Sequence, residues 1–117
     1  MSNHRQPTIS THVLDNERGQ PAVGVRVVLE RREADHFVWL ADALTDADGR
    51  IASLLPGALL AGVYRISFDV ASYFAKQDGE TPFMRTVSIE FEIVDTGRHY
   101  HVPLLATRFA CTSYRGS

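Results

Sequence analysis

A strict two-residue alternation of apolar and polar side chains is the feature of this 117-residue chain that most limits its fold. It is clearest between Met84 and Val94. The apolar members are Val87, Ile89, Phe91 and Ile93, and the polar members between them are Ser88, Glu90 and Glu92. Because successive side chains of a β-strand point to opposite faces of the sheet, this segment predicts a strand with one buried and one solvated face.

Shorter segments with strand character recur along the rest of the chain, separated by turn residues. The further strands that we expect are 9–16, 23–32, 37–45, 51–55, 62–70, 98–105 and 109–114. The segments 16–21, 46–50, 56–57 and 95–97 carry the Asn, Asp, Gly and Pro residues that are typical of turns. We expect one short helix, at residues 71–77. Seven to eight short strands broken by turns predict an all-β fold, an antiparallel β-sandwich with one short helix.

Length and composition bound the organisation of the chain. We expect a flexible N-terminal lead-in at residues 1–8 and a single domain at residues 9–117. The net charge of −2 gives no reason to expect nucleic acid or a membrane as a partner. Cys111 is the single cysteine, which excludes an intrachain disulfide, and we expect its thiol to be buried and inert. The polar start and the lack of a long apolar run favour a cytoplasmic location.

The residues that could carry chemistry are mainly histidines. His99 and His101 share one face of the expected strand 98–105, and the opposite face is the better core face. That core face consists of Tyr100, Val102 and Leu104. His101 should therefore point away from the core, toward a cavity, a partner or water. Together with His12, the two histidines could supply the three imidazoles of a catalytic zinc site, but solvated or hydrogen-bonded histidines fit the same spacing.

Four motifs together resemble those of a known family. They are Ser10 to Asp15, Thr45 to Arg50, His99 to Leu105, and the terminal tetrapeptide Tyr114 to Ser117. The family that they resemble is that of the 5-hydroxyisourate hydrolases, the transthyretin-like enzymes of urate breakdown. The terminal tetrapeptide is the most specific motif, because it separates the hydrolases from the hormone-carrying transthyretins. Residues 107–111 depart from the Ser-Pro pair that members often carry at that place.

The resemblance implies a transthyretin-like (prealbumin-like) sandwich that hydrolyses 5-hydroxyisourate to 2-oxo-4-hydroxy-4-carboxy-5-ureidoimidazoline. Carried over by motif, the catalytic residues are His12, Arg50, His101 and Ser117. The substrate-binding residues are His12, Arg50, Ser117, Tyr114, Arg115 and His99. The resemblance implies no cofactor and no metal. It also implies a homotetramer, a dimer of dimers with the sites in a channel at the dimer–dimer interface.

The chemistry of these residues fits the implied reaction. A neutral histidine can take the proton of an attacking water near pH 7, and a guanidinium can donate paired hydrogen bonds to a developing oxyanion. Ser117 can hydrogen-bond the substrate or the water. The sequence leaves open whether His12 or His101 is the base. It also leaves open three alternatives: a carrier of a small hydrophobic ligand, a zinc hydrolase, and a purely structural domain.

Overall fold

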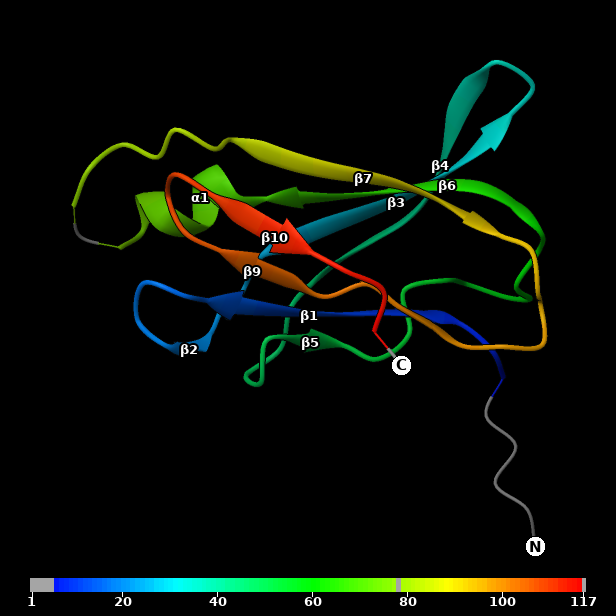
Figure 1. Ribbon diagram of the computed structural model, residues 1–117, viewed down its shortest axis with the longest axis horizontal. Helices are drawn as coiled ribbons and strands as arrows, with labels where there is room; N and C mark the ends of the chain where they lie inside the picture. Colours follow the sequence, from blue (N-terminus) through cyan, green and yellow to red (C-terminus); the bar gives the residue numbers. More distant parts are fainter. Residues whose placement is uncertain (1–5, 78, 117) are drawn as a thin grey trace, which may run out of the picture.

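The structure, a computed structural model, describes residues 6–77 and 79–116 as two β-sheets and one short helix (Figure 1). The first sheet contains β1 (Ile9–Asp15), β2 (Gln20–Pro21), β5 (Arg50–Ile51), β8 (Tyr100–His101), β9 (Leu104–Ala106) and β10 (Cys111–Ser113). The second sheet runs in the order β4 (His36–Leu44), β3 (Arg26–Glu33), β6 (Gly62–Asp69) and β7 (Thr86–Ile93). The helix α1 (Val70–Ala75) follows β6. The all-β sandwich with one short helix is thus confirmed.

Both sheets bury their apolar faces in one shared core. The strands contribute residues that alternate along the chain, such as Ile9 and Val13 on β1 and Val27 and Leu29 on β3, all fully buried. On β7 the predicted alternation is present: Val87, Ile89, Phe91 and Ile93 pack on or against the core, whereas Ser88, Glu90 and Glu92 are exposed. Local periodicity therefore predicted correctly which face of β7 is buried.

β1 lies in the middle of the first sheet and pairs with several strands. It is antiparallel to β2 and β5 but parallel to β8 and β9, so the sandwich is mostly, not wholly, antiparallel. The parallel register places Ile9 beside Tyr100 and Ser10 beside His101. Periodicity did not predict this pairing, because it sets the face of a side chain and not the partner of its strand.

Several expected boundaries differ from the observed ones. The expected strand 98–105 is split into β8 and β9, since Pro103 has no N–H to donate to a ladder. The expected strand 51–55 contracts to β5, and 109–114 contracts to β10. The helix begins at Val70, one residue early, where the Asp69 carboxylate accepts a hydrogen bond from the Ser72 N–H at 3.0 Å.

The segment 107–111, which departs from the family pattern, comprises the turn between β9 and β10 and the first residue of β10, and Arg108 holds this turn in place. The Arg108 side chain is buried, forms an ion pair with Glu17 and lies with its Cζ 5.1 Å from the centre of the Phe74 ring. Its Nε also donates to the carbonyl of Glu80 at 2.9 Å. On β10, Cys111 is partly buried, and burial raises the pKa of its thiol. In the part of the chain that the structure describes, no helix has the length and apolar character needed to cross a membrane.

A buried carboxylate joins the helix to the end of β1. Asp15 has no exposed surface, and its Oδ2 accepts a hydrogen bond from the Tyr73 hydroxyl at 2.7 Å. Its Oδ1 accepts the N–H groups of Glu17 and Arg18 at 3.0 and 3.1 Å. A buried hydrogen-bond acceptor that loses its donor keeps the cost of its desolvation without a compensating hydrogen bond. The three hydrogen bonds to the Asp15 carboxylate should therefore contribute to the stability of the fold.

We predict that Tyr73→Phe lowers the free energy of unfolding by about 1–3 kcal/mol, because it leaves Asp15 Oδ2 without its donor. Urea unfolding of both proteins measures the difference. Thr81→Val is the control, since the Thr81 side chain is exposed and the loss of its hydroxyl should cost far less. Equal losses in the two variants would contradict this role of Tyr73.

The same contact predicts a dependence on alkaline pH. Burial and the hydrogen bond to Asp15 raise the pKa of Tyr73 to about 12, above its ordinary value of 10.0. The folded state therefore holds the phenol proton more tightly than the unfolded state, and this stability is present below pH 10.0 and lost as pH rises toward about 12. In Tyr73→Phe, the free energy of unfolding should fall less steeply over this interval.

Candidate active site

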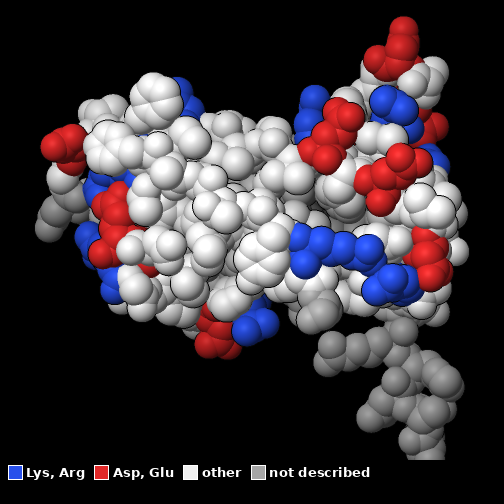
Figure 2. Space-filling view, viewed as in Figure 1, with Lys and Arg blue, Asp and Glu red and all other residues white. Residues whose placement is uncertain are grey.

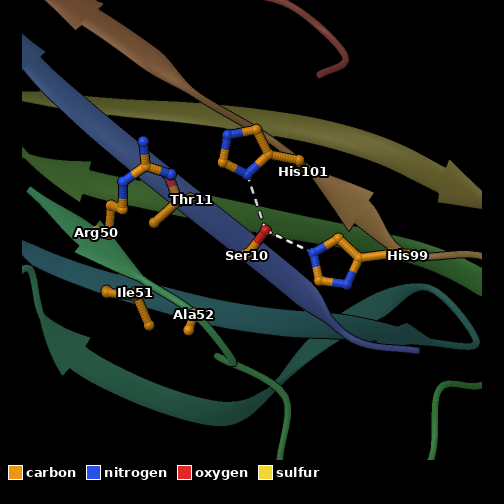
Figure 3. A pocket seen from close by; sticks show the side chains of 7 residues that line it. All are labelled: Ser10, Thr11, Arg50, Ile51, Ala52, His99 and His101. Atoms are coloured by element: carbon orange, nitrogen blue, oxygen red, sulfur yellow. Dashed lines mark hydrogen bonds between the residues drawn. The ribbon is translucent and has the colours of Figure 1, made fainter. Parts of the chain in front are cut away.

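A hollow of about 290 Å³ opens where β1, β5 and the segment before β8 meet (Figure 3). It is lined by Ser10, Thr11, Arg50, Ile51, Ala52, His99 and His101. Ser10 and His101 are register partners, and their strand neighbours Ile9 and Tyr100 point into the core. The hollow therefore lies on the face of the first sheet that turns away from the core. As predicted, His101 points away from the core, and it meets Arg50 and His99 there.

Ser10 stands between the two histidines. Its Oγ lies 2.7 Å from His99 Nε2 and 2.8 Å from His101 Nδ1, and both contacts are hydrogen bonds (Figure 3). The sequence analysis did not select Ser10 as a site residue, although it stands in the motif that includes His12. The parallel pairing of β1 with β8 brings Ser10 to His101, and that pairing was not predicted.

A tight turn holds Arg50 at the hollow. The Asp46 Oδ1 accepts the N–H groups of Asp48 and Arg50, each at 2.9 Å, and the Asp46 N–H donates to the Arg50 carbonyl at 3.0 Å. These backbone hydrogen bonds, from Arg50 and then from Asp48, lower the pKa of Asp46. The expected turn at 46–50 is confirmed, and Asp46 is the carboxylate that orders it.

Gly49 joins this turn to β1. Its carbonyl accepts the Val13 N–H at 2.7 Å, and its φ is +74°. A Cβ at this position would lie 2.5 Å from the Val13 carbonyl oxygen, so a larger residue must displace the backbone. Gly49 thus ties the turn that carries Arg50 to β1, where His12 is the register partner of Arg50.

The surroundings of His101 favour its neutral form. Burial lowers the pKa of His101 below its ordinary 6.5, and the nearby charges of Arg50, His12 and His99 lower it further. His101 is therefore a neutral base near pH 7. In the described ranges, no three His, Cys, Asp or Glu side chains are grouped so that they could hold a metal ion.

The C-terminal tail lies along His101. The Gly116 N–H donates to the His101 carbonyl at 2.8 Å, and a Cβ on Gly116 would lie 2.5 Å from His101 Cδ2. Arg115 and Tyr114 line a different, more apolar hollow of about 360 Å³, which His101 also borders. The Cζ of Arg115 lies 4.7 Å from the centre of the Tyr100 ring. Ser117, a predicted catalytic residue, lies outside the described residues.

Comparison with known proteins gives a consistent result. The sequence profile described as the HIUase/Transthyretin family matches residues 9–116. The 5-hydroxyisourate hydrolase of Deinococcus radiodurans is 43% identical over 121 residues, which cover 100% of both chains. The solved structure of the Klebsiella pneumoniae 5-hydroxyisourate hydrolase is 38% identical, with a TM-score of 0.81 over 94% of this chain and 99% of that one. Sparus aurata transthyretin is 32% identical, with a TM-score of 0.88 over 96% and 97%.

We predict that Gly49→Ala destabilises the protein more than Gly19→Ala. Both glycines have positive φ, which should cost an alanine about 1–2 kcal/mol at either site. Only at Gly49 does the added Cβ meet a backbone oxygen, whereas a Cβ at Gly19 has no atom within 4 Å. Urea unfolding of the two variants measures the difference. Equal destabilisation would show that the approach of Gly49 to Val13 is unimportant.

We also predict that His101 titrates below pH 6.5 and that Arg50→Gln raises its pKa, because that change removes a nearby positive charge. The value should stay below 6.5, since burial is the largest cause and remains. Proton NMR of the imidazole across pH 4–8 measures this shift. Arg65→Gln on the second sheet is the control, and an equal shift there would contradict a local effect of Arg50.

Proposed function

Because this chain belongs to the HIUase/Transthyretin family, we propose that it is a hydrolase that opens the ring of 5-hydroxyisourate in urate breakdown. The observation that carries the proposal is the meeting of Arg50 and a neutral His101 in one open hollow. These groups supply what amide hydrolysis needs, a proton acceptor for water and a donor to the oxyanion.

In the proposed reaction, water attacks a carbonyl carbon of the cyclic amide and His101 accepts the proton of that water. The Arg50 guanidinium donates hydrogen bonds to the oxygen on which negative charge develops. The carbon–nitrogen bond of the ring then breaks, and the departing nitrogen takes a proton. The product is 2-oxo-4-hydroxy-4-carboxy-5-ureidoimidazoline. The chain's own side chains suffice for each step, so the scheme uses no cofactor.

Most of the other predicted site residues enter as substrate contacts. His12 is the register partner of Arg50, which supports a place for it beside the substrate. Ser117 follows Gly116, whose N–H is bonded to the His101 carbonyl, and this supports a Ser117 hydroxyl that binds the substrate or the water. His99 borders the hollow. Tyr114 and Arg115 line the second hollow, which His101 also borders, so we give them the role of holding the tail beside His101 and not of contacting the substrate.

A carrier of a small hydrophobic ligand is the alternative from the same family. The structural likeness to Sparus aurata transthyretin does not decide between the two, since the fold is common to both. The lining of the hollow does favour the enzyme. A guanidinium and two imidazoles are poor contacts for an apolar ligand, which is held best by hydrophobic and aromatic side chains.

The proposal includes a cytoplasmic homotetramer, a dimer of dimers, with residues 9–117 as one transthyretin-like domain. β7 and β10 are the outermost strands of their sheets in the described strand order. Figure 2 shows a largely uncharged surface over the middle of the region that these two strands occupy. Val23, Phe109 and Tyr114 are more than half exposed in the single chain, which supports burial between subunits. Light scattering after size exclusion tests the tetramer, and cell fractionation tests the location.

We predict that the protein accelerates the decay of freshly generated 5-hydroxyisourate, followed by ultraviolet absorbance. Arg50→Ala and His101→Ala should each lower kcat/KM by about 10²–10⁴-fold while the protein stays folded. Arg32→Ala is the control, because Arg32 is exposed on the other sheet. No acceleration by the folded wild-type protein would overturn the proposed function, and retained binding without turnover would then favour the carrier.

A further inference from the structure

We infer that Ser10 and His99 are positioning residues that fix the tautomer of His101, so that its Nε2 carries a lone pair toward the hollow. The hydrogen bonds from Ser10 Oγ to both histidines carry this inference. The tautomer of His101 is inferred from the structure alone. The effect of that tautomer on turnover rests on the proposed function.

A serine hydroxyl has one proton to donate and can accept hydrogen bonds from others. Ser10 Oγ is within 2.8 Å of a ring nitrogen on each side, and a neutral imidazole has one N–H and one lone pair. In the first arrangement that uses both contacts, His101 Nδ1–H donates to Ser10 and Ser10 donates to His99 Nε2. In the second arrangement both donors are reversed, and His101 carries its proton on Nε2.

The hydrogen bonds of Ser10 and His99 limit His101 to these two arrangements, and the charge of Arg50 favours the first one. In Figure 3 the second ring nitrogen of His101, its Nε2, is on the side of the ring that faces the Arg50 guanidinium. A cation attracts a lone pair and repels an N–H, so it favours an unprotonated Nε2. The charged or titratable groups around His101 are Arg50 on β5, His12 on β1 and His99 before β8, and their charges disfavour a second proton on the ring.

This arrangement lets His101 take up a proton without turning. The proton adds at Nε2, while Nδ1–H keeps its hydrogen bond to Ser10, which becomes stronger because its donor is now charged. In the reverse arrangement Nε2 already holds a proton, so the hollow would contain no imidazole lone pair from His101. Ser10, His99 and His101 all line the hollow, and His99 is the exposed end of this chain of hydrogen bonds.

A purely structural role of Ser10 predicts a different result. Ser10 is 7% exposed, and its hydroxyl could simply satisfy two neighbours without any effect on which nitrogen of His101 is protonated. Removal of the hydroxyl would then change stability but leave the tautomer of His101 as it was. The tautomer itself is therefore the readout that separates the two roles.

The first measurement is nitrogen-15 NMR of histidine-labelled protein near pH 8, where two-bond couplings distinguish the two tautomers. A His101→Gln variant assigns the resonances. We expect the Nδ1–H tautomer for His101 in the wild type and a shift toward Nε2–H in Ser10→Ala. Ser10→Thr, which keeps the hydroxyl, should restore the wild-type pattern. His99→Phe should also shift the His101 tautomer toward Nε2–H. His99→Gln should not, since the glutamine amide oxygen can accept a hydrogen bond from the Ser10 hydroxyl.

The second measurement is the pH profile of 5-hydroxyisourate hydrolysis by Ser10→Ala and Ser10→Thr. Ser10→Ala should lower kcat by about tenfold or more with little change in KM, and Ser10→Thr should recover most of it. The His99 variants are compared by NMR alone, because His99 is also a proposed substrate contact. If Ser10→Ala does not fold, the His99 pair carries the test. An unchanged His101 tautomer in Ser10→Ala, or in His99→Phe when the serine variant does not fold, overturns the inference. A wild-type protein that is folded but inactive overturns the proposed function alone, because the tautomer is still read by NMR.

Discussion

The pairing of β1 with the segment that contains β8 and β9 is the interaction on which the rest of this structure depends. It joins the two ends of the chain, since Ser10 and His101 are 91 residues apart. On the core side it buries Ile9, Val13 and Leu104 completely. On the other side it sets Ser10 against both histidines. One register therefore determines both a part of the core and the layout of the site.

The polar residues at the two ends of β1 have different contacts and roles. At its C-terminal end Asp15 is fully buried and satisfied by Tyr73 and two backbone N–H groups, which fastens the helix to the sheet. Arg108 adds an ion pair with Glu17 from the turn between β9 and β10. At the other end, Ser10 faces a hollow open to solvent. The buried polar groups of β1 thus hold other elements in place at one end and, at the other, hold two histidines at the hollow.

This family shows how one sandwich can serve different functions. The fold matches both a hydrolase and a transthyretin closely, so the shape of the backbone does not identify the chemistry. The proposed hydrolysis rests instead on a few side chains on one face of the first sheet. Burial lowers the pKa of His101, Arg50 contributes to the same shift, and a turn ordered by Asp46 keeps Arg50 in place.

Local residue patterns alone were enough to predict the class of fold, the turn at 46–50 and the direction in which His101 points, because strand periodicity and turn chemistry act over a few residues. Motif resemblance marked Arg50 and His101, and the structure brings them together. Ser10 was missed, as were the split of strand 98–105 and the parallel pairing of β1. Those features depend on which distant segments meet and in which register, and only the packing of the whole chain decides that.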